Sequence, residues 1–437
     1  MSLSSVGSEQ KVERPPKRVT AGLGGGVALE WYDWNIYGLM AAFLGPHFFP
    51  SDNPVTSTLS ALAVFGVGFI ARPLGAVLLG PLADRFSHRK VMILSVTTMC
   101  VTSFLMGILP TAETIGIAAG FILVGLRLIQ GLSTGVEAGV ANAVAIQLAP
   151  RGERGRYLGL VAGTFIQFGI VGSAVISYVA SLAIPADALA SWGWRIPFIL
   201  GGIFGVVVIL LRRTLPETLT QKAEDETSEL DIVTDRIGLV WASVWKVRLA
   251  LLAVIFVIAG VTVATYSWNV GLPNLANTVY KEDPALVFLI LVGMGVLFII
   301  AGPVVGRMAD VYGAGRVFTV LRVLLVPASF VMLLYSQPGI WSYAMVMFVG
   351  GTVVASNMGL YNYIATSLMP KSARTTGVSL GTGIAAAVFG GTASYLLLFF
   401  RVNDLYWVFP VYISVLSALS VVFYWLAVRR GHQYVQG

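Results

Sequence analysis

The sequence is poor in charge and in cysteine. Only 11% of its 437 residues are charged and 57% are hydrophobic, whereas a soluble domain carries about 25% charged residues. Its single cysteine, Cys100, excludes a disulfide framework and a cysteine-based metal site. The histidines, at positions 47, 88 and 432, have no metal-binding spacing. These scarcities argue against a soluble enzyme or a metalloenzyme, and we expect no metal and no cofactor.

What the sequence has instead is a succession of long apolar runs. A bilayer core about 30 Å thick needs roughly 20 apolar residues per helical span. The runs are continuous and do not alternate with period two, which favours helices over a barrel. We therefore predict an all-α membrane protein with twelve transmembrane helices. The predicted spans are 20–46, 58–81, 91–109, 114–146, 156–183, 195–213, 248–273, 285–306, 316–336, 341–367, 375–400 and 405–428.

The longest polar interruption lies in the middle of the chain and divides the spans into six and six. The segment from Gly80 to Lys90 recurs as Gly306 to Arg316, and Pro150 to Arg154 recurs as Pro370 to Arg374. Such a repeat indicates two similar halves with the substrate between them near the membrane midplane. The predicted parts are a cytoplasmic tail (1–19), an N-terminal bundle (20–214), a cytoplasmic linker (215–246), a C-terminal bundle (247–428) and a cytoplasmic tail (429–437).

The basic residues fix the expected orientation. Of the 28 Lys and Arg, most fall in the tails, the central linker and every second loop. The exceptions are Arg195, Lys281 and Arg401 in the other loops and Arg72, Arg127 and Arg322 inside spans. Because cytoplasmic loops collect positive charge, both termini are expected in the cytoplasm. The net charge of +7 thus reflects topology, and no nucleic acid is expected as a partner.

Two short loops carry a family resemblance. The first has Gly80, Asp84, Arg85, Arg89 and Lys90 between spans 2 and 3, and its second copy lies between spans 8 and 9. This pattern resembles the signature loop of the major facilitator superfamily, although Ser87 stands where that family commonly has glycine. The resemblance implies a fold of two pseudo-symmetric six-helix halves. The implied gating and signature residues are Gly80, Asp84, Arg85, Arg89, Lys90, Gly306, Asp310, Arg316, Arg154, Arg374 and Arg195.

Further segments narrow the resemblance to one group within that superfamily. The segments from Glu30 to Trp34, from Phe69 to Gly75 and from Arg127 to Glu137 are similar to metabolite:proton symporters, as are Trp192 to Phe198 and Leu211 to Thr218. That group includes permeases for α-ketoglutarate, citrate, shikimate, dicarboxylates, and proline or betaine. The resemblance implies proton-coupled symport by alternating access in a bacterial cytoplasmic membrane. The expected partners of a monomeric protein are then lipid, protons and a small solute.

Charged residues inside the apolar runs are the first candidates for the site. A charge in mid-membrane is expensive, so each one is a functional candidate by default. Glu30, Asp33 and Arg72 fall near the middle of their spans, and Arg127 and Glu137 fall on one face of span 4 with Gln130. A low-dielectric cavity favours protonation of at least one carboxyl group, because arginine does not usefully deprotonate. We predict proton coupling by Asp33 and Glu137, with Glu30 third.

The arginines and several polar residues of the second half are the substrate candidates. Guanidinium groups bind carboxylates well, but Arg72 and Arg127 also suit a purely structural pairing with the buried acids, and both interpretations remain open. Arg195 is open in the same way, between a gate and an interfacial charge. Arg322 lies close enough to the end of span 9 to snorkel and is left out. The predicted substrate-binding residues are Arg72, Arg127, Tyr32, Gln130, Tyr266, Trp268, Asn269, Asn357, Tyr361 and Asn362.

Three functions are weighed on these residues. The first is proton-driven uptake of a small organic anion, a mono- or dicarboxylate such as α-ketoglutarate. The second is uptake of a zwitterionic osmolyte, proline or betaine, whose quaternary amine prefers an aromatic cage such as Trp31, Tyr32, Trp34 and Trp268 would offer. The third, a membrane-embedded enzyme or receptor, lacks any catalytic motif or signalling domain in the sequence.

Overall fold

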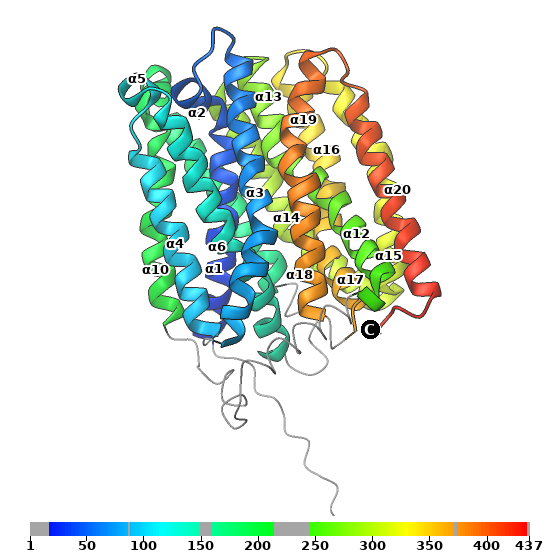
Figure 1. Cartoon of the computed structure of the whole chain (residues 1–437). Helices are drawn as coiled ribbons and strands as arrows, with labels where there is room; N and C mark the ends of the chain where they lie inside the picture. The colour runs from blue at the N-terminus through cyan, green and yellow to red at the C-terminus, as the bar shows by residue number, and fades with distance from the viewer. Residues whose placement is uncertain (1–16, 86–87, 149–159, 214–244, 371–373, 435–437) are drawn as a thin grey trace, which may run out of the picture.

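The computed structural model describes residues 17–85, 88–148, 160–213, 245–370 and 374–434, apart from the side chains of 76–85, 88, 136–148, 161–162 and 374–376. All regular elements in these ranges are helical and run in two adjacent bundles (Figure 1). The expected all-α fold is therefore confirmed. Most of the central linker, most of the N-terminal tail and residues 435–437 lie outside the described residues, and the predicted domain boundaries stay predictions.

The first bundle, here called the N half, contains α1 to α10. Its helices are α1 (Lys17–Leu39), α2 (Ala41–Phe48), α3 (Pro54–Arg85), α4 (His88–Ile108), α5 (Ala112–Ile115), α6 (Ala118–Leu148), α8 (Phe165–Ala183), α9 (Ala186–Ala188) and α10 (Arg195–Arg212), with the π-helical segments η1 (Leu160–Thr164) and η2 (Leu189–Gly193). Within it α3 packs on α6, α4 on α10 and α1 on α8.

The second bundle, the C half, contains α12 to α20. Its helices are α12 (Arg248–Tyr266), α13 (Leu272–Thr278), α14 (Pro284–Tyr312), α15 (Ala314–Phe330), α16 (Ile340–Met358), α17 (Tyr361–Ser367), α18 (Arg374–Ala385), α19 (Gly391–Val402) and α20 (Val408–Arg429), with the π-helical segments η3 (Ser267–Gly271) and η6 (Ala386–Gly390) and the 3₁₀ segment η4 (Val331–Tyr335). Here α12 packs on α20, α14 on α16 and α15 on α20.

Eleven helical stretches in the described ranges are long and apolar enough to cross a membrane. Helix α1 is not among them, although its 23 residues would extend about 34 Å at 1.5 Å per residue. The reason is its polarity, because Glu30, Asp33 and Asn35 interrupt its apolar sequence. The helix that falls short on composition is thus the one that carries the buried carboxylates.

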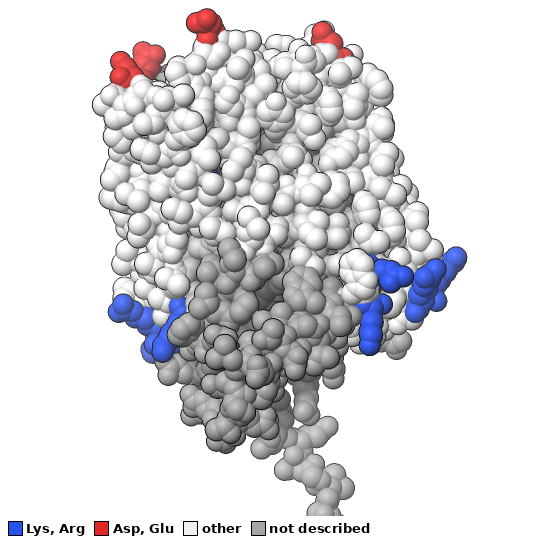
Figure 2. Space-filling view, in the orientation of Figure 1, with Lys and Arg blue, Asp and Glu red and all other residues white. Residues whose placement is uncertain are grey.

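The two ends of the molecule differ in charge. Most exposed Lys and Arg gather at one end and most exposed Asp and Glu at the opposite end (Figure 2). Lys281 and Asp310 are exceptions, each exposed at the end of the other charge. The first, the basic end, holds the start of α1, the end of α10, the start of α12 and the end of α20. The second, the acidic end, holds Asp52, Glu113, Asp187, Asp283 and Asp404, all of them exposed. The side chains thus sort along the helix axes as they do in proteins that span a membrane.

The halves meet along α8 with α14 and along α3 with α18, η6 and α19. At one point backbone meets backbone, because a Cβ atom added to Gly66 of α3 would lie 2.9 Å from the carbonyl oxygen of Gly391. Inside the N half the α3–α6 contact is closer still, and a Cβ atom on Gly131 would lie 2.1 Å from the carbonyl oxygen of Gly68. Small residues at such points let helices approach closely in a membrane.

We predict that Gly131→Ala destabilises the protein by about 1–3 kcal/mol, because the added methyl group overpacks the α3–α6 contact. The measurement is thermal unfolding of the purified protein in detergent. Gly125→Ala is the matched control, since it lies on the same helix and a Cβ atom there meets nothing within 4 Å. Equal melting temperatures for the two variants would contradict the packing argument.

Candidate functional site

Two ion pairs lie inside the N half, near the middle of α1. Glu30 and Asp33 are three residues apart and share one face of the helix. Glu30 Oε1 lies 3.2 Å from Arg72 Nη2 of α3, and Asp33 Oδ2 lies 3.7 Å from Arg127 Nη1 of α6. Three helices that are distant in sequence thus bring these four charged residues into one cluster.

The second pair is part of a closed hydrogen-bond network. The Ser103 hydroxyl donates to Asp33 Oδ1, and the side-chain amide of Gln130 donates to Asp33 Oδ2. Arg127 in turn donates from Nη1 to Gln130 Oε1. Asp33, Arg127 and Gln130 are at most 1% exposed. The carboxylate therefore has a neutral donor on each oxygen as well as a nearby cation, which is the arrangement a buried charge requires.

Aromatic rings cover the faces of both guanidinium groups. Arg127 Cζ lies 3.7 Å from the ring centre of Tyr37, and Arg72 Cζ lies 4.1 Å from that of Trp34 and 4.7 Å from that of Phe69. Trp34 also lies 5.2 Å from Arg127 Cζ, so that one indole stands between the two arginines. Cation–π contacts of this kind gain strength when water is excluded. The rings hold each guanidinium in place and leave its edge for anions.

The two pairs differ in how they relate to the C half. The side chains of Arg72 and Glu30 are 13% and 6% exposed, against 0% for Arg127 and 2% for Asp33. Tyr266 and Tyr361, both from the C half, lie within electrostatic range of Glu30 and Arg72. The Glu30–Arg72 pair thus lies at the seam between the halves, and the Asp33 network lies deeper inside the N half.

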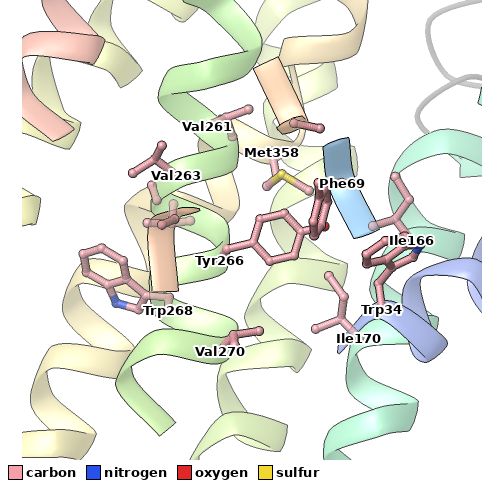
Figure 3. Packing of buried hydrophobic residues seen from close by; sticks show 14 of the residues in the cluster. Trp34, Phe69, Ile166, Ile170, Val261, Val263, Tyr266, Trp268, Val270 and Met358 are labelled. Carbon is pink, nitrogen blue, oxygen red and sulfur yellow. The ribbon is translucent and has the colours of Figure 1, made fainter. Parts of the chain in front are cut away.

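Tyr266 at the end of α12 is the main contact of the C half with this region. Its ring is stacked on that of Trp31, with centroids 6.1 Å apart and an angle of 10° between the planes. It also meets Phe65 and Phe69 of α3 edge-on, at 5.5 and 5.2 Å. Figure 3 shows Tyr266 reaching towards Phe69, with Trp34 beyond it. An aromatic cluster therefore closes the seam beside the Glu30–Arg72 pair.

The other predicted residues of the C half are placed differently. The Trp268 indole donates to the carbonyl of Val346 of α16, 3.1 Å away, and so packs within its own half. The amide of Asn357 donates to the carbonyls of Leu321 and Val353. Asn269 is 1% exposed, and neither of its amide atoms has a hydrogen-bond partner among the described residues. Asn362 is half-buried beside Tyr361.

A family model described as the Major Facilitator Superfamily matches residues 23–393. The chain belongs to the major facilitator superfamily. The matched residues of this transporter include helices of both halves. The family resemblance seen in its signature loops is thereby confirmed. Membership also settles the broad class of the protein, because the family and its named relatives are transporters and not enzymes.

The chain is also similar to several curated transport proteins. The chain is 28% identical to the alpha-ketoglutarate permease of Escherichia coli K12, over 99% of each chain. It is 30% identical to the citrate-proton symporter of Salmonella typhi, over 83% of this chain and 82% of the relative. The proline/betaine transporter of Escherichia coli K12 is 29% identical, over 79% and 69%. These names support the metabolite:proton symporter group and leave the substrate open.

A solved structure confirms the fold of this transporter. The crystal structure of a D-xylose-proton symporter superposes with a TM-score of 0.74, covering 94% of this chain and 97% of the other. The two sequences are only 16% identical, so the likeness concerns the fold alone.

Several predicted residues lie away from the ion pairs or outside the described side chains. The Tyr32 hydroxyl donates to the carbonyl of Pro197 of α10, 2.7 Å away. Arg89 is half-buried and Lys90 exposed at the start of α4, and Gly306, Asp310 and Arg316 lie where α14 meets α15 at the basic end. The predicted residues whose side chains lie outside the described part are Glu137, Gly80, Asp84, Arg85, Arg154 and Arg374.

Arg195 joins the start of α10 to the end of α4 at the acidic end of the N half. Its Nη1 donates to the carbonyls of Gly107 and Leu109 at the end of α4, 3.0 and 2.7 Å away. Arg401 does the same in the C half, where it donates to the Tyr280 hydroxyl at 2.7 Å and to the carbonyl of Ser336. Burial raises the pKa of Tyr280, so this phenol stays protonated. Each arginine therefore holds loops of its own half together.

Arg322 corrects one expectation from the sequence. It does not snorkel, because it is 1% exposed and its Nη2 donates to the carbonyl of Val257 of α12, 2.5 Å away. Its depth along α15 can be counted from the sequence, but the helices packed around it cannot. Sequence reasoning also missed Ser103, which is one hydroxyl residue among several in its span and carries no distinguishing pattern.

We predict that Arg127→Met destabilises the protein by about 3–5 kcal/mol, because it leaves Asp33 buried without its cation. The double variant Asp33→Asn/Arg127→Met removes both charges and is expected to recover most of that loss. Thermal unfolding in detergent compares Arg127→Met, Asp33→Asn and the double variant with the parent. A double variant as unstable as the sum of the single variants would show that the pair is not coupled.

Proposed function

We propose that the protein is a proton-coupled symporter that takes up a small organic anion, a mono- or dicarboxylate such as α-ketoglutarate, by alternating access. The observation that carries this proposal is the Glu30–Arg72 pair at the seam between the halves. A guanidinium at this place offers a carboxylate two parallel hydrogen bonds. The curated relatives named for α-ketoglutarate and for citrate with protons support the same class of substrate.

Competition for Arg72 supplies a coupling mechanism. When a substrate carboxylate binds the guanidinium, it takes the place that Glu30 holds 3.2 Å away. A buried carboxylate that has lost its cation is strongly destabilised and becomes neutral by binding a proton. Uptake of one carboxylate group is thereby tied to uptake of one proton. Release of both restores the Glu30–Arg72 pair, so the empty carrier has no buried unpaired charge at this point.

In this proposal Glu30, third among the carriers expected from the sequence, stands ahead of Asp33 as the carboxyl that exchanges a proton. Asp33 accepts two hydrogen bonds from neutral donors in addition to the charge of Arg127, and all three stabilise its ionised form. In the proposed cycle Asp33 keeps its hydrogen bonds while Glu30 exchanges the proton. Glu137, which the sequence favours equally, lies on α6 and remains a third carrier in the proposal.

The proposed setting is a bacterial cytoplasmic membrane, with the basic end in the cytoplasm. The support is the sorting of exposed Lys and Arg to the end where α1 begins and α20 ends (Figure 2). Both termini would then be cytoplasmic. We propose a monomer that needs lipid, protons and its solute but no cofactor.

Uptake of a zwitterionic osmolyte is the second candidate. The stacked rings of Trp31 and Tyr266 favour it, since aromatic faces bind quaternary ammonium groups, and the proline/betaine relative points the same way. The faces of Trp34 and Phe69 are however already covered by Arg72. A solute at the seam therefore meets the cation of Arg72 and not a free aromatic cage. This favours an organic anion over an osmolyte as the substrate.

We predict that proteoliposomes with an acidic exterior accumulate labelled α-ketoglutarate and not betaine. Arg72→Gln is expected to lower anion uptake at least about a hundredfold, the effect of losing a charge-assisted bidentate contact. Arg430→Gln is the control, because Arg430 is exposed just beyond α20 at the basic end. Betaine accumulation that survives Arg72→Gln would instead establish the second candidate.

We predict that Glu30→Gln separates transport from coupling. The neutral side chain no longer needs a proton when the substrate occupies Arg72, so exchange of internal for external solute continues while uphill accumulation driven by the pH gradient is lost. Counterflow and gradient-driven uptake are measured on the same vesicles. Asp33→Asn is measured for comparison. If only that variant lost gradient-driven uptake, Asp33 and not Glu30 would be the residue that exchanges the coupled proton.

A further inference from the structure

Helix α1 is interrupted at Met40, and the regular pattern of backbone hydrogen bonds breaks there. In a continuous helix the N–H of Ala42 would donate to the carbonyl of Gly38, four residues earlier. In this structure it does not, because α1 ends at Leu39 and α2 begins at Ala41. Both backbone groups lie at the acidic end of the N half, beside the seam.

The side chain of Asn274, from α13 in the C half, fills this gap. Its Nδ2 donates to the carbonyl of Gly38 at 2.7 Å, and its Oδ1 accepts from the N–H of Ala42 at 3.0 Å. One amide group thus takes the place of the missing helical hydrogen bond by pairing with both of its ends. Asn274 is 0% exposed, and Nδ2 also donates to the carbonyl of Val270 in its own segment.

The surrounding contacts close the seam around this amide. The hydroxyls of Thr58 in α3 and Thr278 in α13 lie 3.3 Å apart. The side chain of Val270 is packed so closely on Gly38 that an added Cβ atom there would lie 2.8 Å from it. The two hydrogen bonds of Asn274 and the one between the threonines all join the N half to the C half. All three lie at the acidic end, which is therefore shut.

We propose that Asn274 is the gate residue of the acidic end and that it works by exchange with the helix backbone. When the halves separate there, Gly38 and Ala42 lose the amide but regain each other as hydrogen-bond partners, so α1 and α2 become one continuous helix. The side-chain amide of Asn274 then forms hydrogen bonds with water. In both states the carbonyl of Gly38 and the N–H of Ala42 have a hydrogen-bond partner. The gate therefore opens without the penalty that normally accompanies breaking buried hydrogen bonds.

Nothing in this proposal depends on the solute. It concerns an equilibrium of the empty protein between a shut and an open acidic end, and Asn274 lies outside the cluster around Glu30 and Asp33. The gating role would remain if the substrate proved to be an osmolyte.

The test uses Val270→Cys as a reporter in a Cys100→Ala background, because Val270 is 0% exposed in the shut seam. Proteoliposomes receive a membrane-impermeant thiol reagent, and Asp52→Cys, exposed at the acidic end, reports which face that end occupies. Asn274→Ala is expected to speed labelling of the reporter from the acidic end about tenfold or more, the factor that one to two lost hydrogen bonds give.

Two companion variants make the result specific. Asn277→Ala is the matched control, since Asn277 lies on the same helix and its amide has no hydrogen-bond partner among the described residues; its labelling rate should equal that of the parent. Asn274→Asp replaces the donor by a carboxylate oxygen that faces the carbonyls of Gly38 and Val270 in a buried position, so labelling at least as fast as in Asn274→Ala is expected. Parental labelling in both Asn274 variants, or equal acceleration in Asn277→Ala, would overturn the proposal.

Discussion

The pairing of Glu30 with Arg72 and of Asp33 with Arg127 is the constraint around which the N half is built. A single charge buried at this depth would be costly, so the three helices that carry the partners must hold a fixed register. The α3–α6 contact at Gly131 supplies the closeness, and the indole of Trp34 separates the two guanidinium groups. Charge, aromatic packing and small residues are therefore parts of one arrangement.

This arrangement gives the two pairs different tasks in the proposed cycle. The Asp33 network is enclosed by the N half and resembles a structural core made of polar groups. The Glu30–Arg72 pair borders the C half, where Tyr266 and Tyr361 complete its surroundings. Of the two, only the Glu30–Arg72 pair lies where a solute arriving between the halves would meet it. The proposed cycle uses both pairs, the Asp33 network as a rigid support and the Glu30–Arg72 pair as the exchangeable charge.

The sequence predicts the membership of the site better than its geometry. Glu30, Asp33, Arg72 and Arg127 stand out because a charge inside an apolar run is visible without a structure. Which acid meets which arginine depends on the rotation of three helices, which a linear pattern does not contain. Ser103 is missed because hydroxyl groups are common in membrane helices, and Arg322 was misplaced because depth along a helix says nothing about its neighbours. The fold, by contrast, follows from apolar runs and the duplicated loop.

The neutrality of the two ion pairs has a consequence for energetics in a living cell. Moving one elementary charge through the membrane potential is worth about 2.3 kcal/mol per 100 mV. Because each pair sums to zero, the N-half cluster adds nothing to this electrical work when the unloaded protein reorients. The return of these four side chains therefore costs no electrical work, whether the membrane potential is high or has collapsed.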